Sequence, residues 1–204
     1  SSTSGTTKPS RPVYFSHREV MTIARRNVNI FKFDENSKVV HSRNLHHASA
    51  MLTSLIPSLM VANHHFTFPI SHDTNLEVNG AEPKSWKRIR DEGFTHIMIP
   101  NRKSLKLFLD KFDKPFKKTL NINMCGFSMT QSFVDMAKKH NVCFDSHYGS
   151  IDTAIPLLVN SVDKKSVVKE NCLGYAPDAF YRIKVTGKKV EVYCEMWDKP
   201  RYME

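Results

Sequence analysis

The sequence predicts a mostly β protein built as a barrel or a sandwich. Short apolar segments that suit strands recur along its 204 residues, and turn residues separate them at regular intervals. The strand patterns do not alternate regularly with helix patterns, which argues against a parallel α/β sheet. Together these observations favour an all-β architecture with a few short helices.

The chain is predicted to begin with a helix and then a strand pair. Ser16 and Glu19 have the spacing of a capping box, which predicts a short helix between residues 13 and 26. Residues 28–33 alternate loosely between apolar and polar and are predicted to form a strand. Its partner strand is expected to start at Val39, after a turn.

A proline and an Asn-Gly pair shape the next predicted elements. Pro57 stands in the middle of the apolar stretch 48–62, and proline breaks a continuous helix. The stretch is therefore predicted to form two strands, at 50–53 and 59–62. The Asn-Gly pair at 79–80 predicts a hairpin turn.

The remaining segments are predicted mainly as strands. Residues 103–112 suit a short amphipathic helix or a strand and turn, and residues 130–140 suit a helix in place of a strand. The predicted strands are residues 95–100, 120–125, 142–144, 155–159, 167–168, 180–185 and 190–194. A hinge at 113–118 divides the chain into halves of comparable size.

The composition indicates a folded, basic protein. Thirty Lys and Arg against 20 Asp and Glu give a formal net charge of +10, which predicts attraction to polyanions such as nucleic acid. Simple solubility explains the same charge.

The cysteines and the apolar runs indicate the kind of cellular compartment in which the protein is expected. The four cysteines are widely separated, without a C-x-x-C pair, which predicts free buried thiols and a reducing compartment. Apolar runs stay well short of the roughly 20 residues that span a bilayer. Residues 1–12 are polar, unlike a secretory signal, and are predicted to be a flexible arm.

Four segments, in their order along the chain, carry a family resemblance. They are residues 59–66 with Asn-His-His-Phe, residues 95–100 with Thr-His-Ile-Met-Ile-Pro, residues 150–161 with Ser-Ile-Asp-Thr-Ala-Ile-Pro, and residues 167–174. Their order and hydrophobic rhythm resemble the chymotrypsin-like (3C-like) cysteine proteases of picorna-like viruses. The resemblance implies two chymotrypsin-like β-barrels, at 13–112 and 119–204 with the tail, joined by a linker at 113–118.

The resemblance also implies a degenerate catalytic centre. His65 matches the general base, Thr153 the nucleophile and Asn171 the histidine of the substrate pocket. The acid position falls at or near Thr95. Because a threonine hydroxyl is a much weaker nucleophile than a thiolate, the peptidase is expected to be impaired or inactive.

Other candidate residues leave alternatives open. Cys125 is a candidate displaced nucleophile working with His65, although a buried structural cysteine is the default explanation. His64, His65 and His72 are candidate metal ligands, but surface or core histidines are the simpler explanation. The sequence predicts neither a cofactor nor a metal.

Basic residues interleaved with aromatics form a candidate nucleic-acid surface. Phosphate contacts from lysine and arginine, with base stacking on aromatics, suit RNA. A solvated face above buried phenylalanines is the alternative. The candidate residues are Lys84, Lys87, Arg88, Arg90, Arg102, Lys103, Lys106 and Lys111.

The overall prediction is an impaired 3C-like protease domain from a viral polyprotein that binds RNA. The ends Ser1 and Glu204 suit release by cleavage of such a polyprotein. Viral RNA, the polyprotein and other viral replication proteins are the expected partners, in the host cytoplasm and without a membrane segment. A jelly-roll viral capsid protein and a non-viral RNA-binding β domain are the alternatives.

Overall fold

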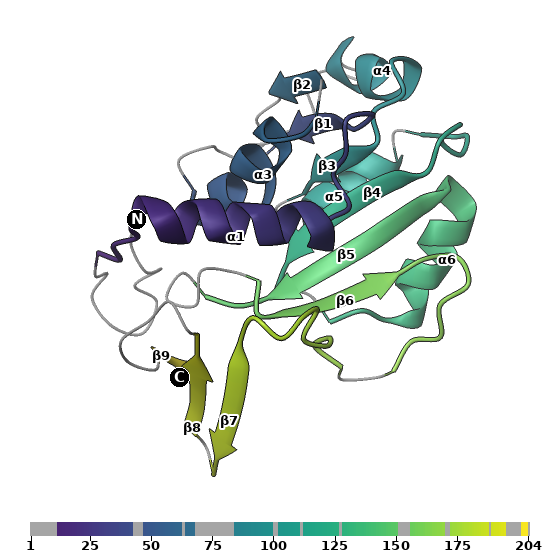
Figure 1. Ribbon diagram of the computed structural model, residues 1–204. Helices are drawn as coiled ribbons and strands as arrows, with labels where there is room; N and C mark the ends of the chain where they lie inside the picture. Colours follow the sequence, from purple (N-terminus) through teal and green to yellow (C-terminus); the bar gives the residue numbers. More distant parts are fainter. Residues whose placement is uncertain are drawn as a thin grey trace.

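The fold is a mixed α/β arrangement around one large sheet (Figure 1). The computed structural model describes residues 12–42, 47–62, 64–67, 84–99, 102–110, 112–126, 128–150, 156–169, 172–187, 189–194 and 201–203. In these residues six strands form a sheet with the order β2-β1-β3-β4-β5-β6, and three more form a separate small sheet with the order β7-β8-β9.

The strands of the large sheet are β1 (Lys38–His41), β2 (His64–Thr67), β3 (His96–Met98), β4 (Leu120–Cys125), β5 (Val142–Tyr148) and β6 (Leu158–Val162). The small sheet contains β7 (Arg182–Thr186), β8 (Lys189–Tyr193) and β9 (Arg201–Met203). The helical segments are α1 (His17–Ile30), α2 (Ala48–Ala50), η1 (Met51–Leu55), α3 (Ile56–Leu59), α4 (Lys84–Asp91), α5 (Arg102–Asp110) and α6 (Gln131–His140).

The large sheet is parallel except at one edge. β1 to β5 run in the same direction, and only β6 is antiparallel to its neighbour β5. Helical segments separate each parallel strand from the next along the chain, as such crossovers require. The prediction of two β-barrels is therefore wrong. The sheet also runs without a break across residues 113–118, because β3 pairs directly with β4.

The stretch around Pro57 accounts for much of the wrong fold prediction. α2, η1 and α3 follow one another without a gap, so the strand predicted at 50–53 is helical. The strand predicted at 59–62 is instead the end of α3 followed by a turn. Pro57 lies in the first turn of α3, where the missing N–H is tolerated. Just before it, the amide of Ile56 bonds to the carbonyl of Met51, five residues back, in the wide pattern of a π-helix. The chain thus remains helical past the proline.

The capping box of α1 is confirmed. The amide of Glu19 donates to Ser16 Oγ over 3.1 Å, and the amide of Ser16 donates to Glu19 Oε2 over 2.7 Å. The helix then continues to Ile30, so the strand predicted at 28–33 is wrong. It ends where Lys32 adopts a positive φ of 56°.

Several other predicted elements are confirmed. β3 and β4 lie within the strands predicted at 95–100 and 120–125, and α6 fills the helix predicted at 130–140. β5 begins at 142 as predicted but continues past 144 to Tyr148. β7 and β8 form a hairpin close to the strands predicted at 180–185 and 190–194. Residues 103–112 are mainly the helix α5, whereas residues 167–168 are not in a strand. The hairpin predicted at 79–80 lies outside the described residues.

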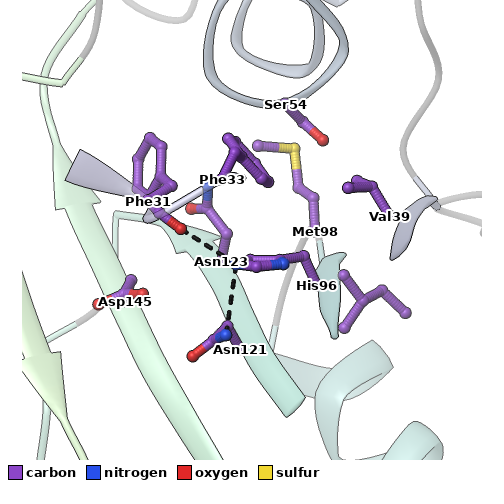
Figure 2. A pocket seen from close by; sticks show the side chains of 10 residues that line it. Phe31, Phe33, Val39, Ser54, His96, Met98, Asn121, Asn123 and Asp145 are labelled. Atoms are coloured by element: carbon purple, nitrogen blue, oxygen red, sulfur yellow. Dashed lines mark hydrogen bonds between the residues drawn. The ribbon is translucent and has the colours of Figure 1, made fainter. Parts of the chain in front are cut away.

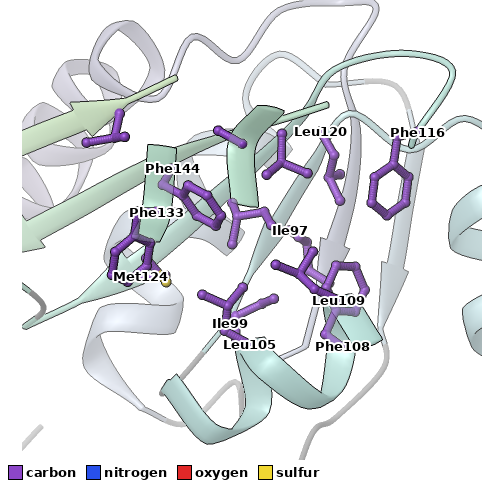
Figure 3. Packing of buried hydrophobic residues seen from close by; sticks show 14 of the residues in the cluster. Ile97, Ile99, Leu105, Phe108, Leu109, Phe116, Leu120, Met124, Phe133 and Phe144 are labelled. Carbon is purple, nitrogen blue, oxygen red and sulfur yellow. The ribbon is translucent and has the colours of Figure 1, made fainter. Parts of the chain in front are cut away.

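The main core covers one face of the sheet. Side chains from β3, β4 and β5 on that face meet those of α5 and α6, as Figure 3 shows. Buried members include Ile97, Ile99, Leu105, Phe108, Leu109, Ile122, Met124, Phe133 and Phe144. Because successive strand residues point to opposite faces, the intervening residues line the other face, which α1 and η1 approach. That second face is unusually polar.

None of the helices in the described part of the chain combines the length and the hydrophobicity that a bilayer span needs.

Candidate functional site

The carboxyl ends of the five parallel strands meet along one edge of the sheet. These ends are His41, Thr67, Met98, Cys125 and Tyr148. From β1 the chain moves to β2 on one side and then to β3 on the other, which creates a switch in winding beside β1. In open α/β sheets, ligands bind outside the carboxyl ends of the strands at such a switch. This edge, called here the carboxyl edge, is therefore the candidate site.

A chain of three hydrogen bonds lies at the end of β1. His41 Nδ1 is 3.2 Å from Ser54 Oγ, His41 Nε2 is 3.1 Å from His65 Nδ1, and His65 Nε2 is 3.3 Å from the carbonyl oxygen of Ala62. A carbonyl only accepts, so His65 Nε2 carries the proton and His65 Nδ1 accepts from His41. It follows that Ser54 donates to His41. The three hydrogen bonds therefore all point the same way, from Ser54 through His41 and His65 to the carbonyl of Ala62.

This arrangement keeps His41 neutral. Burial lowers the pKa of His41 to about 4, and the neighbouring His65 lowers it further in the same direction. With Nε2–H donated to His65 and Nδ1 accepting from Ser54, both ring nitrogens are satisfied in the neutral form. The three side chains thus fix the end of β1 to η1 and β2.

A second polar row runs along β4 and β5 on the same face. Asn123 Oδ1 accepts a hydrogen bond from His147 Nδ1 over 2.8 Å. Asp145 is buried and accepts from Ser161 Oγ on β6 over 2.5 Å. Burial raises the pKa of the Asp145 carboxyl, with the Ser161 bond opposing the shift. At the end of the row, Cys125 lies directly across from His147 in the strand register.

The polar face encloses only a very small cavity (Figure 2). Its volume is about 10 Å³, which is room for one water at most. His96 lies beside it, with Nε2 donating to the carbonyl of Phe31 over 3.1 Å and Nδ1 2.9 Å from Thr95 Oγ1. Burial lowers the pKa of His96 to about 4. The polar face is thus a packed interior that supports the carboxyl edge.

Acid is expected to destabilise the protein through these buried histidines. Because the folded pKa values of His41 and His96 lie near 4, below the ordinary 6.5, stability is full above pH 6.5 and falls as the pH drops toward 4. Asp145 works in the opposite direction, since its raised pKa favours the folded state in acid. His96→Gln should reduce the dependence of the unfolding free energy on pH by about one proton, roughly 1.4 kcal/mol per pH unit.

Urea unfolding of the wild type and His96→Gln at several pH values between 4 and 7 measures this slope. The slope is compared instead of the absolute stability because glutamine also changes local packing. Identical slopes in the two proteins would show that His96 is protonated equally in the folded and unfolded states.

A larger pocket lies between α1, β6 and residues 175–178. It has a volume of about 420 Å³, and its lining residues include Arg26, Asn29, Ser161, Tyr175 and Asp178. Arg26 is buried; its Nε donates to Asp178 Oδ2 over 2.7 Å and its Nη1 to the carbonyl of Pro156 over 2.8 Å. The guanidinium also lies 4.8 Å from the ring centre of Tyr181. These contacts compensate the charge of Arg26 and tie α1 to the chain after β6.

The structure separates the two described residues of the predicted catalytic set. His65 is on β2, whereas Cys125 ends β4, and both β1 and β3 lie between them. Three strand spacings of about 4.8 Å put them about 14 Å apart across the sheet, too far for a base and its nucleophile. Thr153 and Asn171 lie outside the described residues. Within the described part of the chain, His, Cys, Asp and Glu form no group of three or more suited to a metal.

The described arginines of the predicted nucleic-acid surface make contacts within the protein. Arg88 Nε is 2.6 Å from Glu92 Oε1, and Arg90 Nε is 3.0 Å from Asp91 Oδ1. Arg102 Nη2 donates to the carbonyl of Ser128 over 2.9 Å. Of the lysines, Lys106 is exposed on α5, the side chains of Lys84, Lys87 and Lys103 are not described, and Lys111 lies outside the described residues.

The aromatic residues of that surface are buried. Phe108, Phe112 and Phe116 pack on one another, with ring centres 5.1 Å apart for the first pair and 4.7 Å for the second. They belong to the main core, so they are not available to stack on bases. The alternative of buried phenylalanines beneath a solvated face describes this region.

No protein-family model and no curated protein matches this chain.

Solved structures of adenylate-forming enzymes match its fold. O-succinylbenzoate coenzyme A synthetase from Bacillus subtilis, in complex with ATP and magnesium ion, has a TM-score of 0.74 at 14% identity over 95% of this chain and 40% of its own. The inhibitor-bound N-terminal domain of FACL13 from Mycobacterium tuberculosis has a TM-score of 0.76 at 16% identity over 98% of this chain and 50% of its own. The N-terminal subdomain of NpsA from Klebsiella oxytoca, in complex with anthranilyl-AMSN, has a TM-score of 0.68 at 11% identity over 95% of this chain and 50% of its own. The chain thus spans half or less of the length of these proteins.

These matches correct the predicted family. The chain shares its fold with the synthetase and the two N-terminal regions named above, and the resemblance to chymotrypsin-like viral proteases was wrong. The viral protease, the jelly-roll capsid protein and the RNA-binding β domain all need a mostly β architecture, which a parallel sheet with crossover helices excludes. The predictions that the chain is a hydrolase or a pseudoprotease are therefore wrong as well.

Proposed function

We propose that this chain is part of an adenylate-forming enzyme and binds ATP at its carboxyl edge. The observation that carries the proposal is the fold match over 95% of the chain to a synthetase solved with ATP and magnesium. A subdomain solved with anthranilyl-AMSN matches over a similar share. The match concerns nearly the whole chain, and the carboxyl ends of the strands are where open α/β sheets bind ligands.

The proposed chemistry is the activation of a carboxylic acid. A carboxylate oxygen of the substrate attacks the α-phosphorus of ATP and forms an acyl–phosphate bond. The bond between the α- and β-phosphates breaks, and its electron pair leaves with pyrophosphate. The protein has to place the two reactants in line and stabilise negative charge on the phosphates.

The sequence before α1 suits phosphate binding. Residues 2–8 read Ser-Thr-Ser-Gly-Thr-Thr-Lys, which combines five hydroxyls, a glycine and a lysine within seven residues. Hydroxyl and backbone N–H donors on a glycine-containing loop ahead of a helix are a recurrent way to hold phosphates. We assign this run, which lies in the segment predicted as a flexible arm, to the triphosphate.

The sequence after β5 supplies a carboxylate. Asp152 follows Tyr148, the end of β5, by four residues along the chain. Ribose hydroxyls donate to carboxylates, and Mg²⁺ is commonly held by one or two carboxylates together with substrate phosphates. Magnesium would neutralise the phosphate charge; Asp152 is our candidate to hold the ribose or the ion.

Nucleotide binding tests the proposal more directly than turnover, because the chain spans half or less of the matched proteins. Calorimetric titration with ATP and magnesium should show saturable binding, and Asp152→Asn should weaken it about tenfold through loss of a charged hydrogen bond. Asp163→Asn, on the turn after β6 at the opposite edge, is the matched control and should bind like wild type. Equal weakening in both variants, or no saturable binding by the wild type, would refute the proposal.

A further inference from the structure

Seven exposed lysines gather at the edge of the sheet opposite the carboxyl edge. They come from three separate segments, namely the loop before β4, the end of α6 and the turn after β6. The residues are Lys114, Lys117, Lys118, Lys138, Lys139, Lys164 and Lys165, called here the lysine edge.

Hydrogen bonds hold the first two segments together. The amide of Phe116 donates to the carbonyl of His140, and Asn141 Nδ2 donates back to the carbonyl of Phe116, each over 2.9 Å. These bonds place the loop that carries Lys117 directly against the end of α6, which carries Lys138. The parallel pairing of β4 with β5 puts both segments at the amino ends of the strands.

The third segment joins the same edge because β6 is antiparallel to β5. Val162 at the end of β6 pairs with Phe144 near the start of β5, so the turn that follows returns to the amino ends of the parallel strands. In agreement, burial raises the pKa of the Cys143 thiol, one residue after the start of β5, and the nearby charge of Lys164 opposes this shift. On the right of Figure 1, α6, the start of β5 and the tip of β6 lie together.

The lysine edge carries uncompensated charge. None of its seven ammonium groups forms a hydrogen bond or ion pair with another described residue. The described carboxylates nearby are Asp110, Asp113, Asp135 and Asp163, which are fewer than the seven lysines. Asp135 lies one turn before Lys138 and Lys139 on α6, and Asp163 accepts bonds from Ser166 and the amide of Lys165. A net positive patch therefore faces the solvent.

The residue types indicate the kind of partner. All seven are lysines, whose hydrated point charges suit a diffuse anionic surface, whereas arginine is preferred where one carboxylate or phosphate is gripped by two hydrogen bonds. Neither of the two pockets described above is lined by these lysines. Beside them, the Val167 side chain is 95% exposed, although it is apolar.

We propose that the lysine edge docks this protein onto an anionic lipid surface, with Val167 entering the headgroup region. Lysines near such a surface are attracted to its negative potential, and an apolar side chain gains by leaving water. Docking in this way turns the carboxyl edge away from the membrane. The proposed nucleotide site then stays open to the solvent.

Co-sedimentation of the full chain with lipid vesicles tests the proposal. Vesicles of phosphatidylcholine with phosphatidylserine should bind the protein, vesicles of phosphatidylcholine alone should not, and binding should weaken as salt is added. The triple variant Lys117→Gln, Lys138→Gln and Lys164→Gln should lower the partition coefficient about 100-fold, at roughly fivefold per lysine.

Matched controls distinguish the effect of where the lysines lie from the effect of the protein's total charge. The triple variant Arg18→Gln, Lys106→Gln and Lys184→Gln removes the same charge from α1, α5 and β7 and should bind vesicles nearly as wild type does. Val167→Ser should reduce binding only severalfold. ATP binding at the carboxyl edge should be unchanged in the lysine variant, so the two proposals fail independently.

Two results would overturn the docking proposal. One is equal loss of vesicle binding in the two triple variants, which would mean that only net charge matters. The other is complete competition by polyglutamate at an equal concentration of negative charge, which would point to an acidic polypeptide as the partner.

Discussion

Phe144→Ala is expected to lower the free energy of unfolding by about 4 kcal/mol. Phe144 is fully buried on β5 at the centre of the main core. Its ring meets Phe133 of α6 edge-on, with ring centres 5.2 Å apart. Truncation removes this contact and leaves a cavity between β5 and α6, which close-packed surroundings fill only in part.

Chemical denaturation with circular dichroism measures the change. Val185→Ala on β7 is the control, since its side chain is 67% exposed and truncation should cost less than about 0.5 kcal/mol. A loss below about 1 kcal/mol for Phe144→Ala would mean that the interface of α6 with β5 is loosely packed.

Gly174→Ala is expected to destabilise the protein by about 3 kcal/mol. Gly174 has a φ of +121°, and a Cβ at this position would lie 2.5 Å from the carbonyl carbon of Val159. Two bonds of 2.9 Å between the backbones of Val159 and Tyr175 prevent the segments from moving apart. The substitution therefore combines a strained backbone with a collision between main chains.

Gly93→Ala separates these two causes. Gly93 also has a positive φ, of +66°, but nothing lies within 4 Å of its added Cβ. Its substitution should cost about 1 kcal/mol, from backbone strain alone. Thermal unfolding of both variants measures the difference. Equal losses of stability would show that the backbone of Val159 moves away from the added Cβ without a cost in free energy.

The candidate site shows which features the alternation of apolar and polar residues in a strand can predict. β4 reads Leu-Asn-Ile-Asn-Met-Cys, and this alternation already separates Asn121 and Asn123 from the apolar residues between them. This alternation predicts a strand, but it does not distinguish a parallel sheet from a barrel. The polar face became apparent only when β5 brought Asp145 and His147 beside those asparagines. Partners such as Asn123 and His147 are 24 residues apart, a separation that no local pattern encodes.

The family prediction went wrong for a related reason. The order of apolar segments around His65, Thr95 and Thr153 matched a protease, yet strand direction decides which of their ends converge. Parallel pairing of β1 with β2 and β3 sends the strand ends to one edge, whereas barrels would have closed them around a cleft. A different signal was present, because Ser-Thr-Ser-Gly-Thr-Thr-Lys before a capped helix suits phosphate, but composition alone also suits a flexible arm.

The sequence by itself determined the local features of this protein. The Ser16–Glu19 capping box, the strands that became β3, β4 and β5, the helix α6 and the positive charge all follow from neighbouring residues, because caps, periodicity and charge act over a few positions. Tertiary structure alone decided that helices and not strands surround Pro57, that the sheet is parallel, and that lysines from three segments share one edge. Each of these depends on which distant segments bury one another, and that free energy exceeds the local preferences of short apolar runs.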